Sequence, residues 1–284
     1  GHSPISGLIH PGAGSRNSVT EALTNIIWAP LEEGLKSVSL SANWMWPCKN
    51  PGEDARLYQA VEAVSKYAID LGINVPTGKD SLSMKQKYPD GDVISPGTVV
   101  ISAAAHCNDI TKVVEPVFQK HAGSIYYINL TKDDYKLGGS SFGQILSKIG
   151  SETPDIKDTA YVKQVFDVVQ QLIKNDAIAA GHDVASGGLI TTLLEMCFAD
   201  QNLGAELDLS ALSEKDSIKL LFAENCGIVF QAKNDEAIQA YTEALNIIKI
   251  GDVTESDVLS IINQQEVYTL TVSRLRDVWF KTSY

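Results

Sequence analysis

Cysteine is scarce in this sequence, and the few cysteines present are not arranged in pairs. None of them forms a C-x-x-C pair, and none stands at zinc-ligand spacing from a histidine. Three of the four lie in apolar contexts and are interpreted as small core residues. This pattern fits a reducing compartment, so we expect the protein to be cytoplasmic. The cysteines are Cys48, Cys107, Cys197 and Cys226.

Clusters of positive charge and long apolar runs are also lacking. The 284 residues include 23 Lys and Arg against 35 Asp and Glu, which gives a formal net charge of −12. Because no basic cluster interrupts this acidity, we expect no nucleic-acid partner. No apolar run is long enough to span a membrane and no signal peptide is recognisable, so we expect no membrane association. An anionic substrate would need local help from a metal, a helix N-terminus or a single lysine.

The chain is long enough for two domains, and 44% of its residues are hydrophobic, which indicates a globular protein. Residues 112–123 look like a linker, and a strand at Ser124–Leu130 opens the second domain. Helical and strand patterns alternate along the chain, which favours an α/β or α+β fold. The patterns predict a strand and turn at Pro4–Pro11, helices at Asn17–Ala29 and Thr159–Asp176, a long helix after Pro51, and strands at Val38–Met45 and Thr98–His106, the last buried on both faces.

The most informative stretch is Gly181-His182-Asp183-Val184-Ala185-Ser186-Gly187-Gly188, between an apolar strand and an apolar helix. Its three glycines let the backbone approach a ligand closely and direct free N–H groups toward it. Asp183 would repel a bare phosphate but would suit a divalent cation between the two. The alternative interpretation is a tight turn whose aspartate caps the following helix.

Glu21 and Asn25 stand four residues apart on the first long predicted helix, on the face opposite its apolar stripe. A carboxylate and an amide oxygen are hard donors that suit Mg²⁺. A solvated helix face is the alternative interpretation.

A second polar run, Gly78-Lys79-Asp80-Ser81, follows a short strand. Lys79 could offer a cation to a phosphate, and Asp80 could bind metal or hold the loop; a turn with a capping aspartate is the alternative. The run is not a Walker A loop. Glu224 is interpreted either as a structural acid or as an acid that contacts the residues of a site without contacting its ligand. No Ser/His/Asp or Cys/His catalytic set can be defended from spacing.

A series of short motifs occurs in one order along nearly the whole chain. Together they resemble the large, single-chain form of phosphoribosylformylglycinamidine synthase, a glutamine amidotransferase of purine biosynthesis. The motifs are Glu21–Asn25, Ser41–Met45, Pro51–Asp54, Gly78–Met84, Val100–Ala103, Leu137–Ser140, His182-Asp183 with Gly187–Leu189, and Leu194–Ala199.

The resemblance implies two fused copies of an aminoimidazole ribonucleotide synthetase-like unit followed by a glutaminase domain. The chain looks like most of the second copy, without the first copy and the glutaminase domain. We expect residues 1–118 to form the N-terminal sheet-and-helix half-unit, truncated at its start, and residues 119–284 to form the C-terminal α/β half-unit. The remaining domains of the synthase would be its partners, with a homodimer through the N-terminal half-unit as a further possibility.

The family's reaction is an ATP-dependent ligation that converts formylglycinamide ribonucleotide to formylglycinamidine ribonucleotide, with ammonia from glutamine. The resemblance implies that the second copy holds ATP or ADP with Mg²⁺ at an auxiliary site. Carried over by motif, Glu21, Asn25 and Asp183 would bind the metal. Lys79, Asp80 and Ala185 would contact the nucleotide.

The chain departs from the family at Ala185-Ser186, where family members often have Ser-Asp, so a side-chain contact at Ala185 would be lost while its backbone could still serve. We expect the chain alone to be inactive. A non-catalytic assembly module with an empty nucleotide site is the rival hypothesis. A free-standing kinase-like relative is a third, and the Gly78–Met84 run argues against it.

Overall fold

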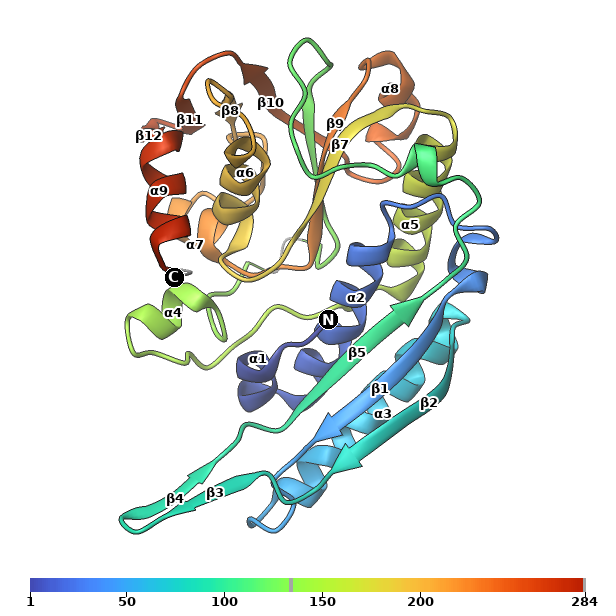
Figure 1. Cartoon of the computed structure of the whole chain (residues 1–284), viewed down its shortest axis with the longest axis vertical. Helices are drawn as coiled ribbons and strands as arrows, with labels where there is room; N and C mark the ends of the chain where they lie inside the picture. The colour runs from blue at the N-terminus through green and yellow to red at the C-terminus, as the bar shows by residue number, and fades with distance from the viewer. Residues whose placement is uncertain (133–134, 283–284) are drawn as a thin grey trace.

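The computed structural model describes residues 1–132 and 135–282 and has two layered parts (Figure 1). In the N-terminal part, helices pack on one face of a three-stranded sheet of order β2-β1-β5. Strand β1 runs parallel to β2 and antiparallel to β5, and a separate β3–β4 hairpin projects beyond the sheet. The elements are α1 (Pro4–Ile9), α2 (Pro11–Ile26), β1 (Ser39–Met45), α3 (Glu53–Leu71), β2 (Asn74–Ser81), β3 (Lys85–Tyr88), β4 (Gly91–Ile94) and β5 (Thr98–Ala104).

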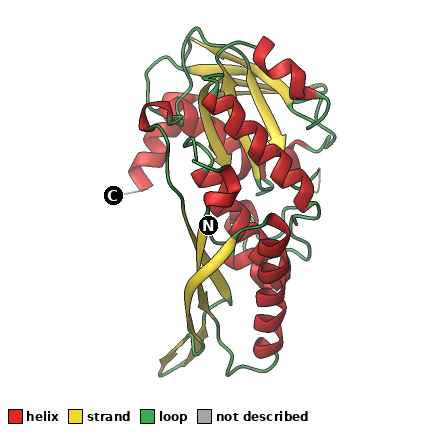
Figure 2. Cartoon of the chain, turned by 90° about the vertical axis from the view of Figure 1, so that its right-hand side faces the viewer, coloured by secondary structure: helices red, strands yellow, loops and turns green. Residues whose placement is uncertain are grey.

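The C-terminal part is built on a seven-stranded mixed sheet of order β12-β11-β8-β10-β6-β9-β7, with helices on both sides (Figures 1 and 2). Its strands are β6 (Ile125–Asn129), β7 (Ile178–Val184), β8 (Gly204–Asp208), β9 (Gly227–Ala232), β10 (Ile248–Thr254), β11 (Val258–Asn263) and β12 (Glu266–Thr271). Its helices are α4 (Ser141–Ile145), α5 (Thr159–Lys174), α6 (Gly188–Phe198), α7 (Ser217–Phe222), α8 (Glu236–Thr242) and α9 (Val272–Thr282). The predicted mixed α/β fold is therefore confirmed.

Five predictions of secondary structure differ from what is found. Gly78–Ser81, predicted to follow a strand, lies within β2, and Gly181–Val184, predicted to belong to a turn, lies within β7. The segment predicted as strand and turn forms helix α1 (Pro4–Ile9), and Pro4 fits at its start because the N–H that proline lacks has no partner in the first turn of a helix. Helix α2 begins at Pro11, earlier than predicted, and the ring of His10 caps it by accepting the Ala13 N–H at 3.0 Å. Strand β5 buries Val99 and Ile101 on its helix-facing side only, because no layer covers the other face.

A single apolar core joins the two parts. It includes Leu23 of α2, Val64 of α3 and Ile101 of β5, together with Phe166 of α5 and Phe230 of β9. A second core lies on the other side of the large sheet, between the strands and α6 and α7. Because the first core draws on both parts, burial of its side chains holds α2 against the C-terminal sheet.

Polar contacts hold α2 and the segment after it against α5 and the loop that precedes α5. Arg16 makes two parallel hydrogen bonds to the carboxylate of Asp155, at 2.8 and 2.7 Å, a geometry that also sets direction. The buried amide of Gln170 accepts the Leu31 N–H at 2.8 Å and donates to the carbonyl of Ala29 at 3.0 Å. The face of α2 that carries Glu21 and Asn25 is therefore held toward the end of β7.

Two findings bear on compartment and chemistry. All four cysteines are free thiols. Over residues 1–132 and 135–282, no helix has both the length and the apolar character that crossing a membrane requires.

Candidate functional site

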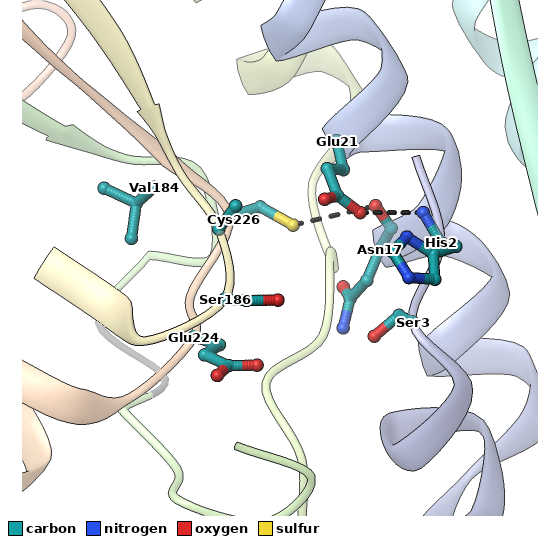
Figure 3. Close-up of a pocket in the computed structure, with 9 residues that line it drawn as sticks. His2, Ser3, Asn17, Glu21, Val184, Ser186, Glu224 and Cys226 are labelled. Carbon is teal, nitrogen blue, oxygen red and sulfur yellow. Dashed lines mark hydrogen bonds between the residues drawn. The ribbon is translucent and has the colours of Figure 1, made fainter. Parts of the chain in front are cut away.

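A small cavity lies where α2 meets the turn after β7, and its volume is about 30 Å³, enough for one ion or water molecule. Figure 3 shows its two sides. Ser186 and Glu224 come from the C-terminal part, whereas Asn17 and Glu21 of α2 face them. The full lining is His2, Ser3, Asn17, Glu21, Val184, Ala185, Ser186, Glu224 and Cys226.

The three predicted metal ligands come together at this junction. Asp183 is only 7% exposed, and its Oδ2 lies 3.4 Å from the amide nitrogen of Asn25. Glu21 lies one helical turn earlier, and its Oε2 accepts the His2 N–H at 2.8 Å. Burial raises the pKa of Glu21, the His2 N–H opposes that shift, and the nearby charge of Asp183 adds to it. The two carboxylates are thus close enough for their charges to interact.

The donor set fits a hard cation that draws its remaining ligands from phosphate and water. Mg²⁺ is usually held in this way, by one or two carboxylates together with ligand phosphates. The described part of the chain contains no group of three His, Cys, Asp or Glu side chains that could hold a metal alone. The amide nitrogen of Asn25, not its oxygen, faces Asp183, so metal binding by Asn25 requires its amide to turn over.

The turn after β7 has the backbone conformation that its glycines allow. Gly187 and Gly188 have φ angles of +91° and +75°, in the left-handed region. A Cβ atom on Gly188 would lie 2.7 Å from the carbonyl oxygen of Leu221. Gly187 provides no side-chain cap for α6, and among the first-turn N–H groups that of Gly188 donates to the carbonyl of Ala185 at 3.0 Å. Ala185 lines the cavity beside them.

His182 connects the site to a second acid. Its Nδ1 lies 3.3 Å from Asp183 Oδ1, and its Nε2 lies 3.7 Å from Glu195 Oε2. Burial alone would lower the pKa of His182, but the two carboxylates outweigh it and the pKa is raised.

A larger cleft of about 420 Å³ lies at the Asn25–Asp183 contact, and these two residues line the cleft but not the small cavity. Its wall combines those two side chains and His182 with apolar groups that include Trp28 and Val114. The cleft volume lies in the range of small-molecule sites, ~300–1,000 Å³.

Lys79 and Asp80 lie elsewhere. Both are exposed on the edge strand β2, and the Lys79 ammonium donates to the Ser81 hydroxyl at 2.9 Å. Neither lines the small cavity or the larger cleft. Their contact with a nucleotide stays a prediction.

Sequence reasoning missed Asn17 and did not place Glu224 in the cavity lining. Asn17 stands four residues before Glu21, on the same face of α2, so helical spacing could have indicated it. Glu224 accepts the N–H groups of Ser141 and Gly187, at 2.7 and 2.8 Å, and so joins two turns that are remote in sequence. No sequence signal indicates that contact.

Two family models match the chain. The "FGAR-AT PurM_N-like domain" model matches residues 1–106, and the "AIR synthase related protein, C-terminal domain" model matches residues 127–263.

Curated relatives carry one name. A "Probable phosphoribosylformylglycinamidine synthase, chloroplastic/mitochondrial" of Arabidopsis thaliana is 40% identical, and the match covers 100% of this chain and 20% of that protein. The phosphoribosylformylglycinamidine synthase of Homo sapiens is 37% identical, with 100% of this chain and 22% of that protein covered. The chain therefore spans about a fifth of the length of these relatives.

Solved structures share the fold. PurL of Thermotoga maritima complexed with FGAR superposes with a TM-score of 0.73 at 13% identity, over 97% of this chain and 44% of that chain. The hydrogenase maturation protein HypE superposes with a TM-score of 0.67 at 14% identity, over 95% of this chain and 86% of that chain.

Proposed function

Because the chain belongs to the phosphoribosylformylglycinamidine synthase family, we propose that it forms the part of such a ligase that holds a magnesium-bound nucleotide at an auxiliary site. The ligase as a whole would use ATP and glutamine to convert formylglycinamide ribonucleotide to formylglycinamidine ribonucleotide. Thermotoga maritima PurL has been solved in complexes with ATP and with ADP, which supports a nucleotide as the ligand.

The observation that carries this proposal is the convergence of α2 and the end of β7. Asn25 lies 3.4 Å from Asp183, and Glu21 is close enough to Asp183 for their charges to interact. Within the proposed site, Glu21 and Asp183 would bind the cation, and Asn25 would add its amide oxygen. The cation would neutralise the diphosphate and place it against the N–H groups at the start of α6.

The chain's own residues would position the nucleotide. The larger cleft of about 420 Å³ would take the nucleoside, with Trp28 and Val114 providing apolar contact. The backbone of Ala185 would contact the phosphates. The domain limits 1–118 and 119–284, the roles of Lys79 and Asp80, and the cytoplasm as compartment belong to the same proposal.

The rest of a larger synthase would be the partner of this chain, since the relatives are about five times its length. A second copy could also bind through the N-terminal half-unit. Sedimentation at several protein concentrations tests that contact, and behaviour as a monomer at every concentration would count against it.

One observation favours the rival hypothesis of an assembly module with an empty site. A backbone N–H already occupies Glu21 Oε2, and the cavity beside it has room for only one ion or water molecule. Calorimetry with ADP and MgCl₂ separates the two hypotheses. Saturable binding that Asp183→Asn abolishes, and that the exposed control Asp70→Asn keeps, supports the nucleotide site. No heat in the wild-type chain supports the assembly module.

A further inference from the structure

Glu224 lies where two glycine-rich turns meet, one before α4 and one before α6. Its Oε1 accepts the N–H of Ser141 at 2.7 Å and the N–H of Gly187 at 2.8 Å. Backbone N–H groups at the start of helices are the groups that proteins use to bind anions. An internal carboxylate therefore already holds two N–H groups that a phosphate oxygen would otherwise take.

The other carboxylate oxygen of Glu224 is available to the cavity. No described residue forms a hydrogen bond or ion pair with Oε2, and Glu224 lines the cavity on the same side as Ser186. Figure 3 shows Asn17 and Glu21 across the cavity from these two side chains. No lysine or arginine is among the lining residues, which the structure describes in full. Two carboxylates thus line a small space whose lining includes one basic side chain, His2, and the ammonium of Gly1 interacts with Glu21.

Asn17 adds an unpartnered acceptor to the same space. Its side chain is 5% exposed, and its amide nitrogen donates to the carbonyl of Pro154 at 2.9 Å. That contact fixes the orientation of the amide, and the buried Oδ1 has no hydrogen-bond partner among the residues that the structure describes. A buried acceptor without a donor is unfavourable, so the cavity suits a cation or the water bound to one.

We propose that Glu224 is a specificity-determining residue, which makes this site accept a diphosphate only when a divalent cation accompanies it; this rests on the proposed nucleotide site. A metal-free phosphate would meet the carboxylate of Glu224 at the N–H groups of Gly187 and Ser141, and like charges repel. A divalent cation removes the repulsion, because Glu224 Oε2 and Asn17 Oδ1 then face positive charge.

Glu224→Gln tests the proposal, because glutamine keeps the shape and one acceptor oxygen while it removes the charge. Calorimetry would measure ADP binding to the whole chain in MgCl₂ and in EDTA. We expect metal-free ADP to bind about tenfold or more tightly to Glu224→Gln than to the wild type, since a like-charge contact is removed. Glu62→Gln is the matched control, because Glu62 is exposed on α3, pairs with Lys66 and lines neither the cavity nor the cleft. It should leave metal-free binding unchanged.

The possible outcomes separate the role of Glu224 from the existence of the nucleotide site. If Glu224→Gln keeps the wild-type preference for magnesium-bound ADP, the role of Glu224 is wrong while the nucleotide site stands. If the wild type binds no ADP and Glu224→Gln binds it without metal, Glu224 excludes anions as proposed and the wild-type nucleotide site is wrong. If neither protein binds ADP under either condition, both statements are wrong.

A measurement without a variant covers the case in which Glu224→Gln does not fold. Amide signals of Ser141 and Gly187 in the wild type would be followed by NMR while ADP is added. They should stay in place in EDTA, because Glu224 retains both N–H groups, and they should move in MgCl₂. Movement of both signals with metal-free ADP would overturn the proposal.

Discussion

Replacement of Asp183 by asparagine is the sharpest test of the metal and nucleotide site. The side chain is 7% exposed, its Oδ2 lies 3.4 Å from Asn25 Nδ2, and its Oδ1 lies 3.3 Å from His182 Nδ1. Asparagine has nearly the same volume, so the packing at the end of β7 should survive. The neutral amide is a poorer Mg²⁺ ligand than the carboxylate, so the loss should concern ligand binding.

The size of the effect follows from linkage. A ligand at 100 times its Kd stabilises the folded state by about 2.7 kcal/mol. If the substitution weakens binding by about 100-fold, the same concentration stabilises by only ~0.4 kcal/mol. For a chain of 284 residues, 1 kcal/mol corresponds to about 2 °C in Tm. The Tm increase caused by ADP and MgCl₂ should therefore fall from about 5 °C to below ~1 °C.

Differential scanning fluorimetry measures both numbers, with Asp70→Asn as the exposed control that keeps the full increase. A second readout needs no ligand. Because the charge of Asp183 helps to raise the pKa of His182, that pKa should fall in Asp183→Asn, as an NMR titration of the imidazole would show. An undiminished ligand-induced Tm increase in Asp183→Asn would refute the reasoning, whatever the histidine does.

The other predictions concern Glu21, Gly188 and the activity of the chain. Burial raises the pKa of Glu21, so ionisation is unfavourable in the folded state. The stability of the wild type relative to Glu21→Gln should therefore be highest below the unfolded pKa of glutamate and should fall as pH rises through the raised pKa. Urea unfolding at several pH values measures the unfolding free energy of both proteins. A stability of the wild type that rises with pH relative to Glu21→Gln contradicts the prediction. Gly188→Ala should lower the unfolding free energy by about 2–3 kcal/mol, because φ is +75° and the new Cβ would lie 2.7 Å from the Leu221 carbonyl oxygen. Gly72 is the control, because its φ of +76° is similar and no atom lies within 4 Å of an added Cβ. Gly72→Ala should lower the unfolding free energy by only about 1 kcal/mol, and equal losses in the two variants would contradict the steric argument. The chain alone should form no product from ammonium chloride, ATP and formylglycinamide ribonucleotide, and turnover near the rate of an intact synthase would contradict this.

Local pattern was sufficient wherever an element buries one regular face. The apolar spacing of Thr159–Asp176 predicted helix α5, found at Thr159–Lys174, and the apolar run after Ser124 predicted β6. The glycines of the 181–188 turn predicted a backbone that bends sharply into a helix, and Gly187 and Gly188 have the left-handed φ values that such a bend uses. These features depend on neighbours within a few residues, which the sequence displays directly.

The N-terminal segment shows where local pattern was insufficient. Pro4–Pro11 has no long apolar period, and its short helix α1 is stabilised by packing against α2. The spacing of Glu21 and Asn25 indicated a shared helix face, but not whether that face meets solvent or another element. Only the packing of α2 against the C-terminal sheet brings Asn25 to Asp183, 158 residues away.

Glu224 marks the limit most clearly. It is one of 35 acidic residues, and the sequence indicated for it only a structural or supporting role, with no contact partner. Its carboxylate receives N–H groups from Gly187 and Ser141, which stand 37 and 83 residues away. The sequence by itself determined most of the helices and strands, the bend at Gly187-Gly188 and the residue types available for a site. The tertiary structure alone decided which of those residues meet, because contacts between distant segments depend on how the elements pack and not on local spacing.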